Sequence, residues 1–372
     1  MRAIGICFKG TEEIAAKEIE EILQVKTRIH DTVVKFDADE QGLAKLCYKA
    51  QSLVKLITEI GNFTADRNLE KTDENIKKCI NKTDFGFLKG ETFKVKCKRI
   101  GSHDFSGQDI APNTGEFILK KVSAKVSMTE PKYIIYVYIH ETFGYIGIDY
   151  SGFDNSKRDY KVFTHSNTLN SSIAFSIFRI AGKEKGLVID PFCGSGVIPI
   201  EAALYSIQKS PHFFIKNKFS FTRFLNIDPE KFDKEKKPKL NVGCSDHVLS
   251  FIKSTRNNAK LAGVSDILRP SKIDIEWLDT KFEKNSIDAI VTHPPSQSRQ
   301  HSKNEIEKLY KEFFHQAEYV LKKDGVIVLC MNNEGPLKKC IENFKIKKKI
   351  SVWQHKQELF VFIITKNINT KT

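Results

Sequence analysis

The sequence lacks the features of several protein classes. No apolar run reaches the ~18–20 residues that span a bilayer, and the first residues read as a short strand and an acidic helix rather than a secretory signal. The eight cysteines are scattered and none forms a Cys-x-x-Cys pair, which favours buried free thiols over a zinc site or a disulfide framework. The histidines have no metal-ligand spacing. We therefore expect a cytoplasmic protein without a metal or a membrane contact.

Excess positive charge is confined to one half of the chain. Residues 1–160 hold 25 Lys and Arg against 24 Asp and Glu, whereas residues 161–372 hold 35 against 22, and the net charge is +14. A field of this sign attracts a polyanion, and nucleic acid is the most obvious one. A basic surface that only keeps the protein soluble is the alternative interpretation.

The N-terminal 150 residues mix strands and helices, which predicts two small α+β units. Apolar and basic residues alternate with a period of two in residues 92–99, as in a half-exposed strand. The expected strands are residues 3–8, 32–37, 92–99, 133–140 and 144–150. The expected helices are residues 11–23, 41–57, 73–81 and 106–121.

The pattern changes after a polar, glycine-containing segment at residues 151–160, which is typical of a linker. Strands then alternate with helices, which predicts an α/β domain with a mostly parallel sheet covered on both faces. The last two strands lack an intervening helix and predict an antiparallel edge. The expected strands are residues 187–190, 241–245, 272–276, 287–292, 325–331, 347–353 and 359–365, and the expected helices are residues 196–206, 248–262, 303–321 and 336–343.

A glycine turn follows the first strand of this α/β part. Glycines permit a tight turn and the close approach of a ligand, and the following helix offers free N–H groups at its start. Ligands of open α/β sheets bind at the carboxyl ends of the strands. No Gly-Lys-Ser/Thr of a P-loop is present, and Pro199 replaces the third glycine of a dinucleotide-binding turn. The turn consists of Asp190, Pro191, Phe192, Cys193, Gly194, Ser195 and Gly196.

A second motif follows the apolar residues 290–292. It consists of His293, Pro294, Pro295 and Ser296. The two prolines restrict the backbone and hold its carbonyls in a fixed direction. This motif is either a site of chemistry or a rigid turn from strand to loop.

The string DPFCGSGVIPIEAAL at residues 190–204 resembles motif I of class I S-adenosylmethionine-dependent methyltransferases that act on the N2 amino group of RNA guanine, in the branch with a THUMP domain. The resemblance covers nearly the whole chain. Residues 93–108 look like the THUMP strand, loop and helix, and residues 145–170 look like the family linker. The archaeal branch that methylates tRNA guanosine-6 is the most similar; relatives modify tRNA guanosine-10 or 23S ribosomal RNA.

The resemblance implies a C-terminal Rossmann-like methyltransferase domain with a seven-stranded sheet, preceded by ferredoxin-like and THUMP domains. The expected division is 1–60 (ferredoxin-like), 61–150 (THUMP), 151–170 (linker) and 171–372 (methyltransferase, with an insertion at 207–240).

The resemblance also implies S-adenosylmethionine as the cofactor, held by residues 190–196. Asp246 follows the second strand and is the expected acceptor for the ribose hydroxyls, with a helix cap as the alternative role. Asp274 is the candidate for the adenine amino group, in competition with Glu276 and Asp279.

The second motif departs from the family pattern of Asn/Asp-Pro-Pro-Tyr/Phe at both ends. In the family, the Asn or Asp side chain and the first proline carbonyl accept the two amino hydrogens, and the aromatic ring stacks on the flipped base. His293 can accept one hydrogen bond while it is neutral. Ser296 provides no ring, which removes about 1–3 kcal/mol of stacking. Tyr310 and Phe313 lie too deep in the next helix to replace it.

Candidate RNA contacts occur in two regions. In the THUMP unit, Lys96, Lys98 and Arg99 follow one another on a single strand. In the insertion, basic residues are mixed with phenylalanines, which either stack on bases or pack the loop onto the protein. The basic candidates there are Lys216, Lys218, Arg223, Lys236 and Lys237.

The sequence therefore predicts a tRNA guanine-N2 methyltransferase that binds structured RNA as a monomer. The alternatives are a non-catalytic RNA-binding protein on the same scaffold, an enzyme that acts on tRNA guanosine-10 or ribosomal RNA, or a methyltransferase for another amino substrate.

Overall fold

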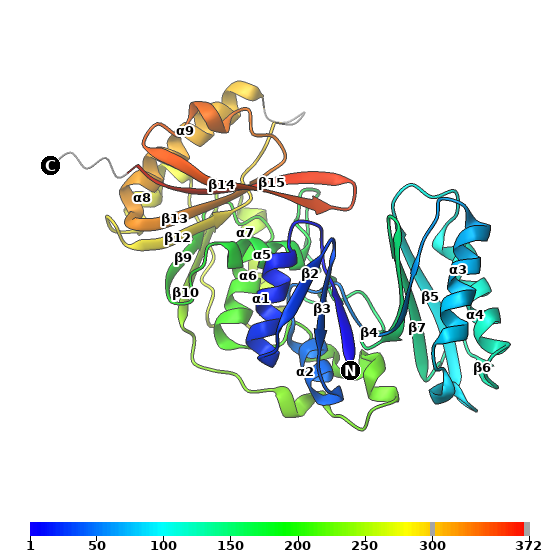
Figure 1. Cartoon of the computed structure of the whole chain (residues 1–372). Coiled ribbons are helices and arrows are strands. Elements are labelled where there is room, and N and C mark those ends of the chain that lie inside the picture. The colour runs from blue at the N-terminus through cyan, green and yellow to red at the C-terminus, as the bar shows by residue number, and fades with distance from the viewer. Residues whose placement is uncertain (298–301, 368–372) are drawn as a thin grey trace.

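The computed structural model describes residues 1–297 and 302–367, which form two β-sheets (Figure 1). The N-terminal sheet has the strand order β2-β3-β1-β4-β8-β7-β5-β6. Its strands are β1 (Arg2–Ile6), β2 (Thr27–His30), β3 (Val33–Asp37), β4 (Lys55–Thr64), β5 (Thr92–Ile100), β6 (Lys125–Val126), β7 (Tyr133–His140) and β8 (Phe143–Asp149). Its helices are α1 (Glu12–Leu23), α2 (Glu40–Lys49), α3 (Leu69–Lys82) and α4 (Gly107–Leu119).

Strand β4 joins the two halves of this sheet. Its first residues pair with β1, and residues 57–64 pair with β8, with a register shift between Glu59 and Gly61. The close approach of β4 and β8 requires a glycine at position 147, because a Cβ there would lie 2.1 Å from the Thr58 carbonyl oxygen. The sheet is therefore continuous across residue 60.

The predicted helix at residues 41–57 is wrong in its second half. Helix α2 ends at Lys49, and the apolar residues that seemed to continue it belong to a turn and to β4. Leu56 and Ile57 are fully buried because they pair with β1. Pairing with a distant strand overrides the local helical pattern.

The C-terminal sheet has the order β11-β10-β9-β12-β13-β15-β14. Strands β9 to β13 pair in parallel, and β15 and β14 are antiparallel, which confirms the predicted sheet. Its strands are β9 (Gly186–Asp190), β10 (Leu240–Asp246), β11 (Ser271–Lys272), β12 (Ile287–Thr292), β13 (Leu321–Met331), β14 (Phe344–Gln354) and β15 (Gln357–Lys366).

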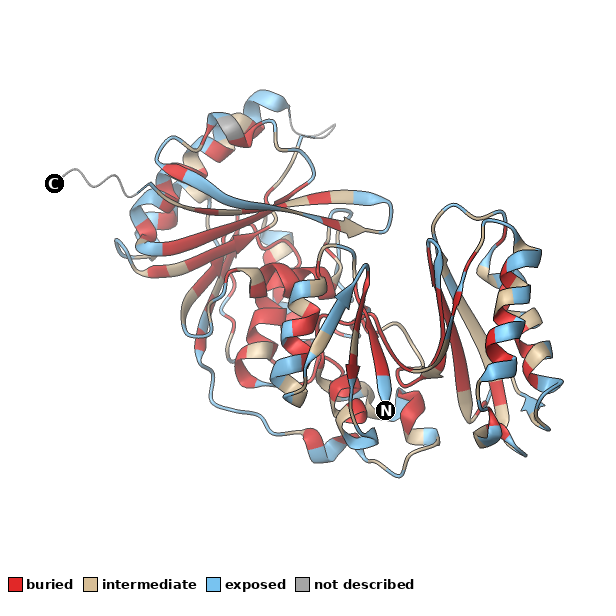
Figure 2. Cartoon of the chain, in the orientation of Figure 1, coloured by how far each residue is buried: buried red, intermediate tan, exposed pale blue. Residues whose placement is uncertain are grey.

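Helices cover both faces of this sheet and bury an apolar core on each (Figure 2). One core contains α5 (Ser171–Ile180), α6 (Val197–Ile207) and α7 (Leu249–Ala262), and the other contains α8 (Leu278–Lys281) and α9 (Lys303–Val320). Two expected elements are shorter than predicted. The third strand ends at Lys272, and residues 336–343 contain only a 3₁₀ turn at Leu337–Lys339.

Residues 208–239 contain three short 3₁₀ helices: Phe213–Lys218, Ser220–Arg223 and Pro229–Phe232. Phe219 and Phe221 are fully buried, in the same apolar cluster as Tyr48 and Leu46 of the N-terminal part. The interpretation of these phenylalanines as packing residues is therefore correct for this pair. The insertion therefore packs against the N-terminal part and connects it to the C-terminal α/β part.

No helix within the described residues is long and apolar enough to cross a membrane.

Candidate active site

The glycine turn lies between β9 and α6 at the carboxyl edge of the parallel strands. Gly194 and Gly196 have φ angles of 53° and 82°, which lie in a backbone region that residues with a side chain rarely adopt. A Cβ at Gly196 would lie 2.5 Å from Cγ2 of Thr255, and that threonine donates to the Gly194 carbonyl oxygen at 2.8 Å. Both the backbone conformation and the packing therefore require glycine at position 196.

Asp190 connects the two motifs of the sequence. Its Oδ1 accepts hydrogen bonds from Oγ1 of Thr292 at 2.6 Å and from the Phe192 N–H at 3.2 Å. Burial raises the pKa of the Asp190 carboxyl to about 7. Because Thr292 immediately precedes His293, this side chain fixes the end of β12 against the end of β9.

Asp246 supports the glycine turn from the end of β10. Its Oδ2 accepts from the Gly194 N–H at 3.0 Å, and its Oδ1 accepts from the Val248 N–H at 2.9 Å, at the start of α7. The bond to Val248 is the helix-start role considered from the sequence. A carboxylate has about four lone-pair sites, so these bonds leave acceptor capacity for hydroxyl groups.

Two cavities adjoin the turn and share Phe192 in their walls. The larger cavity, of about 370 Å³, is lined by apolar Ile273 and Ile275 and by the exposed Asp274. Glu276, which competes with Asp274, lines it as well, whereas Asp279 does not. The smaller cavity, of about 40 Å³, is lined by Asp190, Ser195, His165, Thr168 and His293 among others. The geometry thus brings both sequence motifs to one place.

His293 has a defined orientation at the small cavity. Its Nδ1 lies 2.7 Å from the Cys330 carbonyl oxygen, which can only accept, so Nδ1 carries the hydrogen. In the neutral ring, Nε2 then has a free lone pair. Burial lowers the pKa of His293 more than its bond to the Cys330 carbonyl raises it, and the proximity of His165 lowers it further. His293 is therefore a neutral hydrogen-bond acceptor at physiological pH.

A buried residue of helix α9 holds the rest of the proline corner in place. The hydroxyl of Tyr310 donates to the Pro295 carbonyl oxygen at 2.8 Å, and Tyr310 and Phe313 are both buried. Neither ring is exposed for stacking, as the sequence analysis expected. Ser296 is partly buried, and residues 298–301 lie outside the description.

Three residues that shape this region belong to no sequence motif. His165 stacks on Phe251 with ring centroids 4.6 Å apart. Oγ1 of Thr168 lies 3.3 Å from Oγ of Ser195. Asn258 donates to the Ser195 carbonyl oxygen at 2.9 Å and also bonds the backbone of Phe163. The linker carried no chemical signature, so only the fold brings it to the turn.

Two of the three basic candidates of the THUMP unit line a separate cavity of about 730 Å³ between β5, the start of α4 and residues 153–154. Lys96 and Lys98 line it together with Gln108. Nζ of Lys96 donates to the Gly152 carbonyl oxygen at 2.9 Å, and burial lowers the pKa of this lysine. Arg99 is instead bonded to the Gly101 carbonyl oxygen, outside the cavity lining.

The basic residues of the insertion differ in how far they are already paired. Lys216 contacts Glu230 and Asp233 at 3.3 and 2.5 Å. Lys218 is exposed and lies 3.5 Å from Asp159, and Arg223 donates to the Pro131 carbonyl oxygen at 3.0 Å. Lys236 and Lys237 are exposed.

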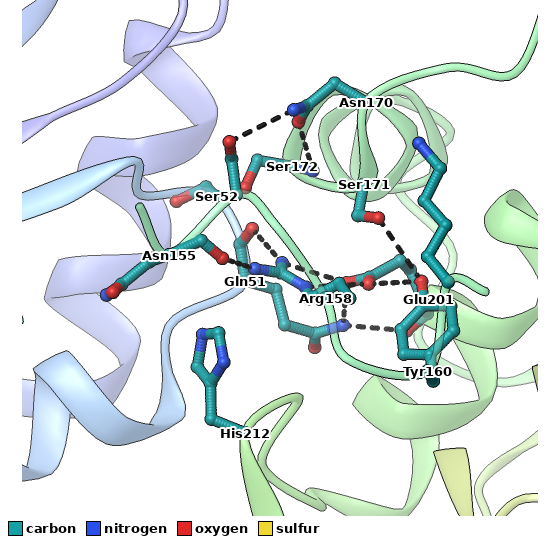
Figure 3. Close-up of polar contacts among 12 residues, drawn as sticks. Gln51, Ser52, Asn155, Arg158, Tyr160, Asn170, Ser171, Ser172, Glu201 and His212 are labelled. Atoms are coloured by element: carbon teal, nitrogen blue, oxygen red, sulfur yellow. Dashed lines mark hydrogen bonds and ion pairs between the residues drawn. The ribbon is translucent and has the colours of Figure 1, made fainter. Parts of the chain in front are cut away.

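A buried polar network joins the helix of the glycine turn to the N-terminal part (Figure 3). Arg158 and Glu201 form an ion pair at 2.9 Å, and both side chains are 0% exposed. Nε2 of Gln51 donates to Oε2 of Glu201 at 2.7 Å, and the Gln51 carbonyl accepts from Arg158. Tyr160 donates to the same carboxylate at 2.7 Å. Removing one partner of a buried pair costs about 3–5 kcal/mol, so this network fixes three chain segments together.

The seven-stranded sheet, the glycine turn after β9 and the acidic residue that ends β10 define a Rossmann-like methyltransferase. Comparison with family models agrees: an RMKL-like methyltransferase domain matches residues 158–361, and a THUMP domain matches residues 67–149. The chain belongs to the family of THUMP-containing RMKL-like methyltransferases.

Similar curated proteins include two archaeal enzymes. The chain is 30% identical over 92% of its length to the tRNA (guanine(6)-N2)-methyltransferase of Methanocaldococcus jannaschii, 94% of which is covered. It is 29% identical over 86% of its length to the enzyme of the same name from Archaeoglobus fulgidus, 80% of which is covered.

Similar solved structures have the same overall fold. A possible methylase from Clostridium difficile 630 has a TM-score of 0.83 and 22% identity, with 100% of this chain and 99% of that chain covered. TrmN from Thermus thermophilus has a TM-score of 0.72 and 19% identity, with 98% and 99% covered.

Proposed function

We propose that this protein transfers the methyl group of S-adenosylmethionine to the N2 amino group of a guanosine in tRNA, in the cytoplasm, with guanosine-6 of the acceptor stem as the expected target. The observation that supports this most is the 30% identity, over 92% of the chain, to an archaeal protein named for that reaction. The THUMP match supports an RNA substrate.

The residues around the glycine turn fit S-adenosylmethionine. The larger cavity offers apolar Ile273 and Ile275 to a flat base and Asp274 to an amino group. The Asp246 carboxylate has acceptor capacity beyond its two backbone bonds. Once bound, the cofactor would supply an electrophilic methyl group on its positively charged sulfur.

The proline corner can orient a guanine amino group. This group is conjugated and weakly nucleophilic, so its lone pair must be turned out of conjugation toward the methyl. Nε2 of His293 accepts one amino hydrogen, because Nδ1 is bonded to the Cys330 carbonyl. The Pro294 carbonyl is the proposed second acceptor, since Tyr310 already bonds the carbonyl of Pro295. Positioning of this kind accounts for a large share of rate enhancement.

The RNA contacts are proposed to lie on both parts of the chain. The cavity beside Lys96 and Lys98 offers two lysine side chains that can pair with phosphate. Exposed Lys236 and Lys237 of the insertion provide further phosphate contacts. Lys218 and Arg223 are exposed and stay candidates, whereas Lys216 is paired with two carboxylates and Arg99 is bonded to the backbone.

The test is methyl transfer by the full-length protein to unmodified tRNA transcripts at pH 8, with radiolabelled S-adenosylmethionine. We expect incorporation into a transcript with guanosine at position 6 and none when inosine, which lacks the amino group, replaces it. Incorporation with both would move the target to another nucleotide. No incorporation, while an archaeal relative is active in the same assay, would favour a non-catalytic RNA-binding protein, which the absence of a ring at Ser296 makes the principal alternative.

A further inference from the structure

A fourth cavity lies outside the sites described above. It has a volume of about 590 Å³ and lies between the linker, the first 3₁₀ helix of the insertion and the end of α7. Three large apolar side chains in its wall are exposed: Phe163 at 42%, Phe214 at 65% and Leu261 at 43%. Exposed apolar groups that gather around a cavity mark an interaction site more often than scattered ones do.

Positive charge surrounds these rings. Phe213, also in the wall, has the Nζ atoms of Lys209 and Lys216 each 4.3 Å from its ring centroid. These two lysines also pair with acids of the insertion, so the excess charge comes from elsewhere.

Helix α7 supplies that excess charge. Over Leu249–Ala262 it contains Lys253, Arg256 and Lys260, all exposed, and no Asp or Glu. Lys260 lines the cavity itself, and Asp159, the acid of the lining, lies 3.5 Å from Lys218. Exposed rings beside unneutralised cations are the combination that binds unpaired nucleotides, because the rings stack on bases and the cations attract phosphates.

The cavity is also connected to the active site by a short path. Phe163 lies in its wall, and His165, only two residues further along the linker, lies in the wall of the small cavity with His293. Asn258 bonds both the backbone of Phe163 and the carbonyl of Ser195 in the glycine turn. An RNA strand that contacts the linker therefore passes close to the site of methyl transfer.

We propose that this cavity holds an unpaired nucleotide of the RNA substrate, with its base against Phe214, the most exposed ring of the wall, and its phosphate near Lys260. The inference rests on the proposed function only in taking RNA as the substrate. It adds a base-stacking site that the glycine turn, the proline corner and the THUMP cavity do not contain. A protein surface as the occupant would not require the cations of α7.

The experiment measures binding of the full-length protein to a fluorescently labelled short single-stranded RNA and to an unmodified tRNA transcript, without cofactor. Phe214→Ala is the test variant, and Phe143→Ala is the matched control, because Phe143 on β8 is also 65% exposed but does not line the cavity. We expect Phe214→Ala to weaken binding of the single strand about tenfold, as the loss of one stacked base does, and Phe143→Ala to leave it unchanged.

A second variant tests the charge. Lys260→Ala should reduce the dependence of log Kd on log salt by about one ion. The proposal would be overturned if Phe214→Ala and the unchanged protein bound both RNAs with equal affinity. It would also be overturned if this variant lost self-association while its RNA binding stayed intact, because the cavity would then be a subunit interface. Binding is measured without methylation, so the two proposals can fail separately. If the unchanged protein transfers no methyl group but Phe214→Ala binds RNA more weakly than it does, the proposed reaction is refuted and this binding site is supported.

Discussion

The glycine turn and the proline corner lie side by side but are held in different ways. The turn is fixed through its backbone, by N–H bonds to Asp190 and Asp246 and by left-handed glycines that tolerate no Cβ. The corner is fixed from outside, since Tyr310 holds the Pro295 carbonyl and His293 bonds the carbonyl of Cys330. The turn therefore allows little variation in sequence, whereas the corner can keep its shape while its side chains, and with them its chemistry, change.

The requirement for glycine in the turn can be tested at Gly196. We expect Gly196→Ala to weaken cofactor binding about 100-fold, because the new Cβ would collide with Thr255 and distort the turn. Calorimetric titration with S-adenosylmethionine measures this. Gly182→Ala is the matched control, since Gly182 has a similar φ of 66° and nothing within 4 Å of the added Cβ. Equal affinity of the two variants for S-adenosylmethionine would show that position 196 does not require glycine.

The tolerance of the corner can be tested at His293. His293→Asn keeps an acceptor and should retain the methylation rate or raise it, whereas His293→Ala removes the acceptor and should lower kcat about 10- to 100-fold. Single-turnover methylation of tRNA measures both. His30→Asn, on the exposed edge strand β2, controls for the loss of a histidine elsewhere. Equal rates for all variants would show that His293 does not contact the amino group.

The pH dependence of methylation should distinguish the contribution of the proline corner from that of the glycine turn. Burial lowers the pKa of His293, so its imidazole stays neutral above its ordinary value of about 6.5, and the loss of activity that is due to His293 should occur only below that pH, where the imidazolium can no longer accept a hydrogen bond. Asp190, with a pKa of about 7, titrates in the unchanged protein and in His293→Asn alike. The difference between the two pH–rate profiles therefore reports His293, and identical profiles would contradict its role.

A smaller effect is expected from restoring the missing ring. Ser296→Tyr should lower KM for tRNA a few-fold and leave kcat nearly unchanged, because a stacked base gains about 1–3 kcal/mol, of which part is lost in ordering the new side chain. Steady-state methylation with varied tRNA measures it. Ser296→Leu, which adds bulk without an aromatic ring, should not lower KM. An equal fall in both variants would indicate apolar packing rather than stacking.

Strongly periodic and motif-bearing segments could be predicted from the sequence. Strands β9, β10 and β12 and helices α6, α7 and α9 were found within a few residues, because a buried parallel strand followed by a helix leaves a clear apolar pattern. Strand β4 could not be found, since residues 53–57 fit a helix as well as a strand until their pairing with β1 is known. Helix α5, rich in small and apolar residues without a motif, was also missed.

The candidate site divides in the same way. Asp190, the glycines and the prolines were identified because their types are tied to backbone geometry, which local sequence encodes. His165, Thr168 and Asn258 were not, because each acts through a contact with a residue far away in the chain.

By itself, the sequence determined the α/β class, the glycine turn and the altered proline corner, because these depend on short-range patterns of burial, glycine and proline. Only the tertiary structure decided the tautomer of His293, through the carbonyl of Cys330, and the burial of the insertion's phenylalanines against the N-terminal part. It also decided the attachment of α6 to that part through Gln51, Arg158 and Glu201. Hydrogen bonds and packing between distant segments set these features, and no local pattern specifies which distant atoms will meet.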